Sequence, residues 1–309
     1  MTHASSDTWV LIPSYNDRPA VTACLESLYD SSVGGFTQLL VDDASTDDTA
    51  EYVKRRFPGC RVRVNANNLG FAGCCNKGLG VALDEGAKFV LLLNQDTLLE
   101  RDTLARLIGF LEARPEAGVV GPKTYSFDRM PDGSPKLLYA GSWQRPLLPL
   151  RQHIPGIERS EVTPAVDPVQ VDYVWGHGML IRTEALRRTG LFDTDYPMYY
   201  EDLDLCRRMR SAGYEVWCDP RAVMWHDQPD GARSTRSDYW RWACKVRSAT
   251  VFYRKHVGGW RAPLMANLTH LADVAQLARS GRLRAARDLA TAATRHLLGL
   301  RDHLRGTAA

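Results

Sequence analysis

Apolar runs and helical spacings alternate along the first third of the chain. Strand-like apolar runs occupy 8–15, 37–45 and 87–96, and 60–67 alternates as a strand does, whereas 20–31 and 46–57 show helical spacing or helical charge order. The glycine-rich stretch 70–86 is predicted to be a tight turn that leads into a helix. This alternation predicts an α/β fold, with a Rossmann-like, mostly parallel twisted sheet flanked by helices and ligands at the carboxyl ends of its strands.

The pattern changes after residue 125. Residues 126–170 are rich in turn formers and weakly periodic, which predicts a loop-rich segment over the active face. Strand character returns at 171–182, a helix is expected to start near Thr183, and from 233 onward the chain is helical. We therefore expect an α/β domain over 1–232, built from halves 8–125 and 126–232, and a C-terminal helical extension over 233–309.

The charge is unevenly distributed, although the composition of 44% hydrophobic and 24% charged residues is typical of a globular protein. Residues 233–309 carry 15 Lys and Arg against 4 Asp and Glu, while residues 1–232 carry 24 against 32. Tryptophans and tyrosines are mixed with the basic residues of 234–261. This predicts contact with an anionic membrane surface; the alternative is a helical cap packed on the catalytic body. No nucleic-acid recognition motif accompanies the basic residues, so no nucleic acid is expected as a partner.

Cysteines and hydropathy bear on the compartment. The seven cysteines include no CxxC pair and no zinc-ligand spacing, which favours a reduced, cytoplasmic protein. The first residues do not resemble a signal peptide, and the longest strongly apolar run, 89–93, is far shorter than a membrane span. We expect a cytoplasmic location, with peripheral attachment to the inner face of the cytoplasmic membrane through the basic extension as an option.

Acidic residues mark three predicted strand ends or helix starts. Asp42 and Asp43 follow one apolar run, Asp96 follows another, and Glu201–Asp202 open a helix, while His226 follows the apolar stretch 222–225. In an open α/β sheet the residues just past the strand ends share one crevice, so Asp43 and Asp96 are expected to face the same ligand.

Each of these residues also has an ordinary structural explanation. Asp42 and Asp43 could cap the helix that follows them, and Asp96 with Thr97 could cap the next one. His226 could be a hydrogen-bonded structural histidine, and Glu201–Asp202 could simply favour the positive end of a helix dipole. Taken singly, none of the positions decides between the two explanations.

The order of the motifs distinguishes the functional explanation from the structural one. "IPSYN" (12–16), "LLVDDASTDDT" (39–49), "NNLGFAGCCNKG" (67–78), "LLLNQDT" (91–97), "VWGHGMLIRTEAL" (174–186) and the long segment 192–226 follow one another along residues 8–232. This succession resembles the family 2 glycosyltransferases, inverting enzymes of GT-A fold, and more closely their rhamnosyltransferase-like branch.

The resemblance implies a role for each matched position. The half 8–125 would bind the nucleotide, and the half 126–232 would hold the acceptor and metal. Asp202 falls on the family's catalytic base, with Glu201 beside it in the ED dipeptide. Asp96 and His226 fall on metal positions. The nucleotide-sugar-binding positions are Pro13, Tyr15, Asp42, Asp43, Gly70, Phe71, Asn76, Asn94, Gly176 and His177.

One position departs from the family pattern. Asn94-Gln95-Asp96 lies where the family usually has two carboxylates, so Asp96 is the only acid. The expected Mg²⁺ or Mn²⁺ ion would therefore be held weakly and with help from the donor's diphosphate oxygens.

The expected activity is inverting transfer of a sugar from a nucleotide-diphosphate donor to a hydroxyl of a glycan or lipid-linked acceptor. The branch resemblance favours dTDP-L-rhamnose, followed by UDP-hexoses. Two other classes are alternatives: a nucleotidyltransferase, which would need a basic glycine-rich loop near residues 12–20, and a non-catalytic sugar-nucleotide-binding module, which would tolerate loss of Asp202 and His226.

Overall fold

A computed structural model describes residues 7–130, 132–143, 167–227 and 238–300. The chain divides into two compact units, the first comprising 1–143, 153–192 and 205–228 and the second 144–152, 193–204 and 229–309. The domain boundary expected near residue 232 remains a prediction.

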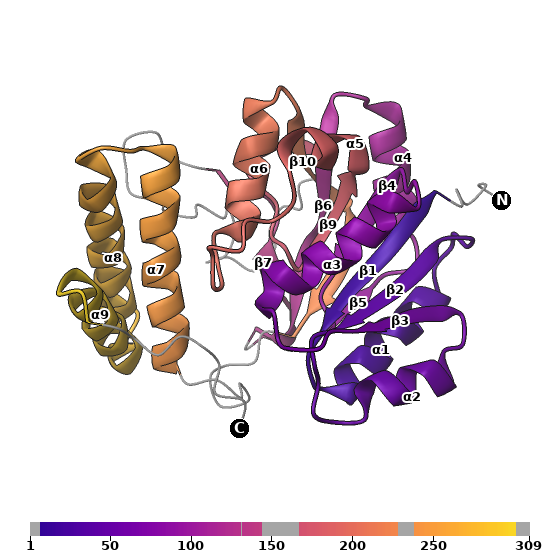
Figure 1. Ribbon diagram of the computed structural model, residues 1–309, viewed down its shortest axis with the longest axis horizontal. Coiled ribbons are helices and arrows are strands. Elements are labelled where there is room, and N and C mark those ends of the chain that lie inside the picture. Colours follow the sequence, from indigo (N-terminus) through magenta and orange to yellow (C-terminus); the bar gives the residue numbers. More distant parts are fainter. Residues whose placement is uncertain (1–6, 131, 144–166, 228–237, 301–309) are drawn as a thin grey trace. The chain divides into compact units, whose positions relative to one another are not determined.

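The first unit is built on a ten-stranded sheet (Figure 1). Its strands are β1 Thr8–Ser14, β2 Thr37–Asp42, β3 Cys60–Val64, β4 Phe89–Leu93, β5 Thr97–Leu99, β6 Ala117–Arg129, β7 Pro135–Tyr139, β8 Val169–Gln170, β9 Gly178–Arg182 and β10 Glu215–His226. Their order is β3-β2-β1-β4-β9-β6-β10-β5, with β7 paired to β6 and β8 to β10. The strands β3, β2, β1 and β4 are parallel, and β9 joins them antiparallel to the β6–β10 pair.

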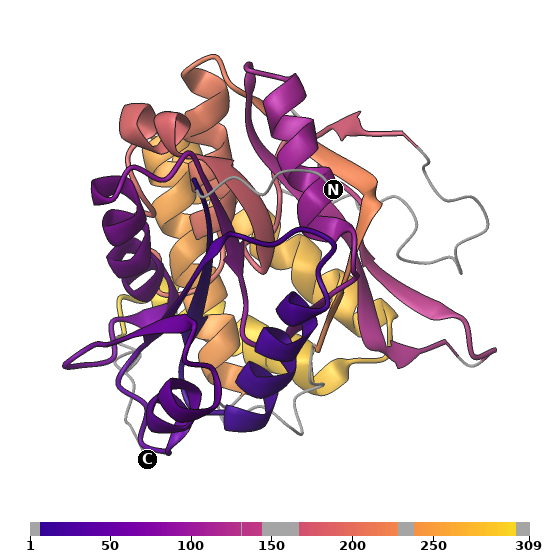
Figure 2. The same cartoon turned by 90° about the vertical axis from the view of Figure 1, so that its right-hand side faces the viewer.

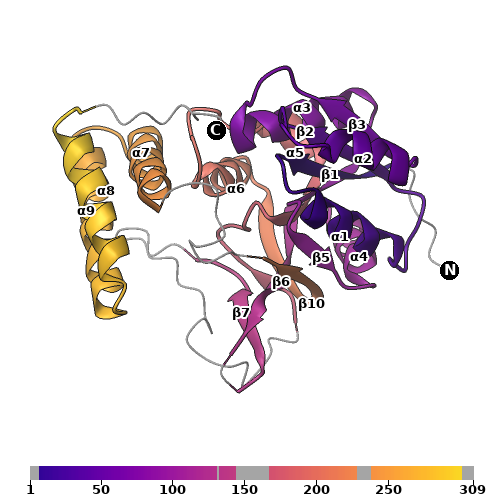
Figure 3. The ribbon, with the colours of Figure 1, turned by 90° about the horizontal axis from the view of Figure 1, so that it is seen from below.

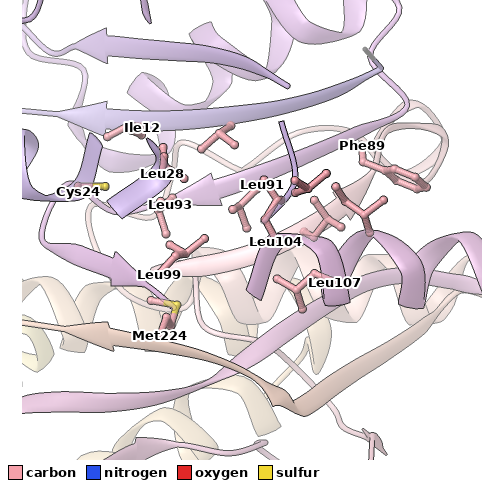
Figure 4. Packing of buried hydrophobic residues seen from close by; sticks show 14 of the residues in the cluster. Ile12, Cys24, Leu28, Phe89, Leu91, Leu93, Leu99, Leu104, Leu107 and Met224 are labelled. Atoms are coloured by element: carbon pink, nitrogen blue, oxygen red, sulfur yellow. The ribbon is translucent and has the colours of Figure 1, made fainter. Parts of the chain in front are cut away.

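Helices cover both faces of this sheet. They are α1 Arg18–Tyr29, α2 Thr49–Arg56, α3 Gly70–Asp84, α4 Thr103–Ala113 and α5 Thr183–Thr189, followed by α6 Glu201–Ser211, which begins in the second unit. Figure 3 shows α1 and α4 on one side of β1 and α3 on the other. The core under α1 and α4 is mainly aliphatic, with Leu28, Leu91, Leu93 and Leu104 in one cluster that also contains Phe89 (Figure 4).

The opposite face depends on a close approach of α3 to the sheet. A Cβ atom at Gly78 would lie 2.1 Å from Cδ1 of Leu11 and 3.0 Å from Cγ2 of Val41. Only glycine allows the helix to sit this near β1 and β2, and the Sγ of Cys74 then donates to the Val41 carbonyl at 3.3 Å. The glycine-rich stretch is therefore helix from Gly70 onward, which corrects the expected turn.

The second half of the sheet was only partly predicted. Residues expected to be loop at 126–129 belong to β6, and β7 pairs with β6 to form a two-stranded arm that runs beyond the other strands in Figure 2. Residues 171–177 lie outside regular strands, and β9 starts only at Gly178. The predicted loop also contains β8 at 169–170, and its residues 144–166 lie outside the described residues.

The described C-terminal part of the chain is helical, as expected. It contains α7 Asp238–His256, α8 Arg261–Arg279 and α9 Leu283–Leu297, which pack side by side (Figure 1) around Val246, Leu277 and Leu289. None of the helices within the described ranges has the length and hydrophobicity that a membrane-spanning segment requires.

Candidate active site

The loops that follow β1 and β2 are tied to each other. Asn16, with a positive φ of 52°, receives a hydrogen bond from the Thr46 backbone at 2.9 Å and donates its own backbone N–H to Ser45 at 2.7 Å. Pro13 fits the end of β1 because pairing with β4 stops at Leu11, so no ladder donor is lost there. Both loops are thereby held at one edge of the sheet.

Asp42 and Asp43 are buried at this edge, and neither caps α2. Asp43 accepts hydrogen bonds from the backbone of Leu69 and Gly70 and from the Asn65 amide, all at 2.9–3.0 Å, so it organises the start of α3. Oδ1 of Asp42 accepts from the Ser45 backbone at 2.8 Å. The alternative in which they cap the next helix is wrong, since α2 begins after Asp48.

Asp96 follows β4 and precedes β5, a strand that the sequence did not reveal. The helix expected directly after Asp96 begins only at Thr103, with Asp102 at its N-cap position, so Asp96 is not a helix cap. β5 pairs antiparallel with β10, which places His226 opposite Thr97. Nε2 of His226 lies 3.2 Å from Oδ1 of Asp96 without hydrogen-bond geometry.

His177 completes a small group of buried rings. Its imidazole stacks on His226 with ring centroids 4.6 Å apart, and Nε2 lies 3.0 Å from the Thr124 hydroxyl. Burial, together with the positive charge that His226 can carry, lowers the pKa of His177 well below its ordinary value. A neutral His177 can therefore stack on His226 without charge repulsion. Thr124 lies in β6 and belongs to no sequence motif, so nothing in the sequence pointed to it.

Several buried polar atoms at this edge have no hydrogen-bond partner among the described residues. They are Oγ of Ser14, Oδ2 of Asp42, Oδ1 of Asn94, Oδ1 of Asp96 and both ring nitrogens of His226. Buried polar groups are almost always paired, so such a cluster indicates a place that a polar ligand or an ion completes. All five residues lie at or just beyond the ends of β1, β2, β4 and β10.

Other predicted binding residues are committed to local structure. Both polar atoms of the Asn76 side chain bind the backbone of Phe192, at 2.8 and 3.0 Å, and Phe71 meets Phe192 edge-on. The Tyr15 backbone N–H donates to Gln95 at 2.9 Å, which joins the loops after β1 and β4. Gly176 lies between β8 and β9, next to His177, whose carbonyl accepts from the Asn94 backbone at 3.0 Å.

Glu201 and Asp202 belong to the second unit and form the first turn of α6. Oδ1 of Asp202 accepts from the Leu203 backbone at 2.7 Å. Glu201 is 7% exposed, and burial together with the Asp202 charge raises its pKa to about 8. Their position at the helix start agrees with both the dipole explanation and the catalytic one.

No cluster of three or more His, Cys, Asp or Glu side chains with metal-binding geometry occurs among the described residues. Asp96 and His226 nevertheless fit part of a divalent-metal site, because a carboxylate oxygen and an imidazole nitrogen face each other, both lacking a hydrogen-bond partner. They would supply two ligands, so the remaining ones would have to come from the substrate.

Comparison with solved structures defines the class of fold. The chain resembles the mannosyltransferase PcManGT of Pyrobaculum calidifontis, solved with GDP-Man and Mn²⁺, at a TM-score of 0.56 and 21% identity, covering 98% of this chain and 83% of that one. It also resembles GalNAc-T7, solved with UDP, GalNAc and Mn²⁺, at a TM-score of 0.56 and 14% identity over 80% and 50% of the two chains. The fold class is thus confirmed as GT-A, with a C-terminal helical extension.

The sequence comparisons identify the family. Residues 9–190 match the model of glycosyl transferase family 2, and the chain belongs to this family. It is 28% identical to an N-acetylglucosaminyl-diphospho-decaprenol L-rhamnosyltransferase of Mycobacterium tuberculosis over 88% of this chain and 95% of the relative. It is 24% identical to a poly-beta-1,6-N-acetyl-D-glucosamine synthase of Staphylococcus epidermidis over 75% and 53%. The protein is a rhamnosyltransferase-like glycosyltransferase that uses a nucleotide-sugar donor, which excludes the two alternative classes.

Proposed function

We propose that the protein transfers L-rhamnose from dTDP-L-rhamnose, with inversion, to a hydroxyl of a glycan or lipid-linked acceptor in cell-envelope polysaccharide synthesis. The observation that carries this proposal is the group of unpaired buried atoms at the carboxyl edge of the sheet, in a chain similar over nearly its whole length to an L-rhamnosyltransferase. UDP-hexoses are the competing donors.

The diphosphate would bind beside Asp96 and His226. A divalent ion held by these two residues and by the diphosphate would neutralise the charge that develops on the leaving group. Asp96 has a side chain 29% exposed, whereas that of His226 is 9% exposed, so the carboxylate is the more accessible of the two. With only two protein ligands, the ion would be weakly bound until the donor arrives, and Mg²⁺ or Mn²⁺ would serve.

The nucleotide would occupy the edge near β1 and β2. Oδ2 of Asp42 is a buried acceptor without a partner, which supports a direct contact from this residue to a donor N–H or hydroxyl. Asp43 already accepts hydrogen bonds from three N–H groups of the 65–70 loop. It would therefore contribute to the base and ribose pocket, with Pro13 and Tyr15, partly by holding this loop in place.

Asp202 would act as the general base. It would accept the proton of the acceptor hydroxyl while that oxygen attacks the anomeric carbon opposite the leaving diphosphate, which inverts the configuration. Because the pKa of Glu201 is about 8, Glu201 would be largely protonated at neutral pH, so the neighbouring pair would carry one negative charge. That single carboxylate is the one available to receive a proton.

A donor screen tests the proposal. The purified protein, with Mn²⁺, is offered dTDP-L-rhamnose and a panel of UDP- and GDP-sugars, and release of the nucleoside diphosphate is followed. We expect release from dTDP-L-rhamnose first; preference for another sugar would refute the donor, and no release from any would refute the activity. Asp202→Asn should lower transfer about 100- to 10,000-fold while donor affinity stays nearly unchanged; a fully active variant would place the base elsewhere.

The basic extension would bring the enzyme to its acceptor. Residues 233–309 carry a net charge of +11, which suits the anionic inner face of a cytoplasmic membrane, where a lipid-linked acceptor would be anchored. The enzyme would thus attach peripherally to the membrane.

A further inference from the structure

The outer side of α8 carries an unusual row of exposed apolar residues. Trp260, Leu264, Leu268 and Leu271 follow at intervals of four, four and three residues, and all are exposed, with Trp260 at 73% and Leu271 at 66%. At 100° per residue these positions fall on one side of the helix. Together they form what we call the α8 outer row.

The α8 outer row is not the face that packs in the helical unit. The buried residues of α8 are Ala262, Ala266, Thr269, His270 and Leu277, and their mean direction is nearly opposite to the row. A surface helix ordinarily places polar residues away from its packed face. This helix instead exposes one tryptophan and three leucines on the side away from its packed face, which marks the outer row as a contact surface.

The charges around the row indicate what it contacts. Residues 239–300 contain 11 Lys and Arg but only two acids, Asp273 and Asp288. Asp273 is paired with Lys245 at 2.8 Å, and Asp288 lies 4.0 Å from Arg287. Exposed Arg261 and Arg279 stand at the two ends of α8, and the Arg261 guanidinium lies 5.6 Å from the centre of the Trp260 ring. Exposed leucines with an interfacial tryptophan and flanking arginines suit a bilayer surface with anionic headgroups.

A second copy of the chain is a poorer occupant. Pairing the row with itself would bring two strongly basic surfaces together, and like charges across an interface disfavour association. We infer that the α8 outer row docks on an anionic lipid surface, with its apolar side chains in the headgroup region and the arginines at the phosphates. This deepens the proposed membrane attachment and rests on that part of the proposed function.

Vesicle co-sedimentation of the full-length protein tests the inference. We expect binding to vesicles of phosphatidylcholine with phosphatidylglycerol, weaker binding to phosphatidylcholine alone, and at least a ~10-fold loss of binding for the variant Leu264→Gln/Leu271→Gln, as expected when two buried apolar side chains are lost. Tyr29→Gln, an exposed aromatic residue of the first unit, is the control and should bind as the unchanged protein does.

The outcomes separate this inference from the proposed reaction. Vesicle binding needs neither donor nor acceptor, and release of nucleoside diphosphate in solution should be unchanged in the double variant. The inference is overturned if the unchanged protein ignores anionic vesicles or if the double variant binds them equally well. It is also overturned if sedimentation shows that the unchanged protein is a dimer and the double variant a monomer, because the row would then be a self-association surface.

The segment that leads to Asp202 has an unusual backbone conformation. Tyr199 and Tyr200 both have left-handed backbone conformations, with φ of 69° and 70°, which side-chain-bearing residues adopt only when the surroundings impose them. α7 provides those surroundings within the second unit. Ser248 donates to the Met198 carbonyl at 2.8 Å, and the Phe252 ring lies 5.6 Å from that of Tyr200.

α7 also binds the side chain of Asp204, which lies in α6 two residues after the predicted base Asp202. Asp204 is fully buried. Its Oδ1 lies 2.7 Å from Nε2 of His256 and 3.0 Å from Nζ of Lys255, which also binds Asp193 at 2.6 Å. A buried carboxylate that loses its cationic partners is costly, so this contact fixes the segment firmly to α7.

We propose that Asp204, Lys255 and His256 are positioning residues that set the carboxylate of Asp202 through the first turn of α6. The C-terminal extension then contributes to turnover as well as to attachment. This proposal depends on the proposed role of Asp202 but not on the lipid surface.

Steady-state kinetics with matched variants test it. His256→Ala should lower kcat by about 10-fold or more with donor KM nearly unchanged, as expected when a catalytic group is misplaced, and His256→Gln should restore part of kcat because its amide can still donate to Asp204. The control Lys245→Ala breaks another α7 ion pair, with Asp273, and should leave kcat unchanged.

Hydrogen exchange supplies a readout that does not require activity. Amides of residues 196–204 should exchange faster in His256→Ala than in Lys245→Ala. Equal kcat in both variants, or failure of His256→Gln to restore any activity, overturns the positioning role. If Asp202→Asn is fully active, the proposed function fails instead, whatever the exchange data show.

Discussion

Glu201 gives the most quantitative prediction, because its protonation should couple folding to pH. Burial and the Asp202 charge raise its pKa from 4.5 to about 8. Between these values the unfolded chain has released this proton while the folded protein keeps it, so stability falls as pH rises. This loss of stability is absent below the pKa of Glu201 in the unfolded chain and reaches its full size above the pKa in the folded protein.

The magnitude follows from the shift. Each pKa unit corresponds to 1.36 kcal/mol. Because Glu201 ionises more easily in the unfolded chain, it lowers the free energy of unfolding by up to about 3 kcal/mol at pH 7 and by about 5 kcal/mol above pH 8. Glu201→Gln keeps the shape of the protonated side chain and cannot ionise. We therefore expect the variant to match the unchanged protein near pH 4.5 and to become progressively more stable than it toward alkaline pH.

Urea unfolding of both proteins at about pH 5, 7 and 9 measures this difference directly. The control is Glu184→Gln, which makes the same substitution at an exposed acid in the first turn of α5. A stability difference for Glu201→Gln that stays constant across the three pH values would refute the reasoning, because a buried, protonated Glu201 requires the difference to grow.

Three further predictions concern the metal pair, the α3 contact and the start of α3. Asp96→Asn should raise the Mn²⁺ concentration needed for half-maximal donor cleavage by about 10- to 100-fold, as measured in a metal titration; an unchanged midpoint would contradict the site. Gly78→Ala should lower the free energy of unfolding by about 1–2 kcal/mol through its clash with Leu11, while Gly80→Ala in the same helix, which meets nothing within 4 Å, should raise it by ~0.5–1 kcal/mol; urea unfolding decides. Asp43→Ala should lower stability by about 1–3 kcal/mol by orphaning the Leu69 and Gly70 donors, and a neutral result in thermal unfolding would contradict the hydrogen bonds described.

The first half of the fold was predictable because its pattern is local. Strands β1, β2 and β4 are short apolar runs and β3 alternates apolar with basic residues, while the helices between them have periodic spacing or clear charge order, so each element can be read from its own residues. The second half depends on distant partners. β5 has three residues and gains its strand character only by pairing with β10, and β10 itself changes register against β6 between Asp219 and Val223. Such pairings leave little trace in a linear sequence.

In the candidate site, the sequence predicts which residues take part but not which partners they contact. The motifs named Asp43, Asp96, His177 and His226, and the structure brings Asp96 and both histidines together. The sequence did not reveal which partner each residue has: Asp43 binds the 65–70 loop, and His177 meets Thr124 from a strand without any motif. The helix-capping explanation failed because capping depends on where a helix begins, and the boundaries of α2 and α4 lie several residues later than the acids suggested.

The segment that carries Asp202 depends on helices that lie beyond the motif region. Its motif lies inside the region that resembles the family, yet residues 193–204 form one compact unit with helices that begin beyond residue 232. The buried Asp204 requires cationic partners, and His256 and Lys255 supply them from beyond the motif region. A variant truncated after residue 232 would therefore leave the Asp204 carboxylate buried without its partners or release it to solvent. In either case the first turn of α6 would lose its support, so a catalytic domain cut at the end of the motif region should bind donor yet turn over poorly.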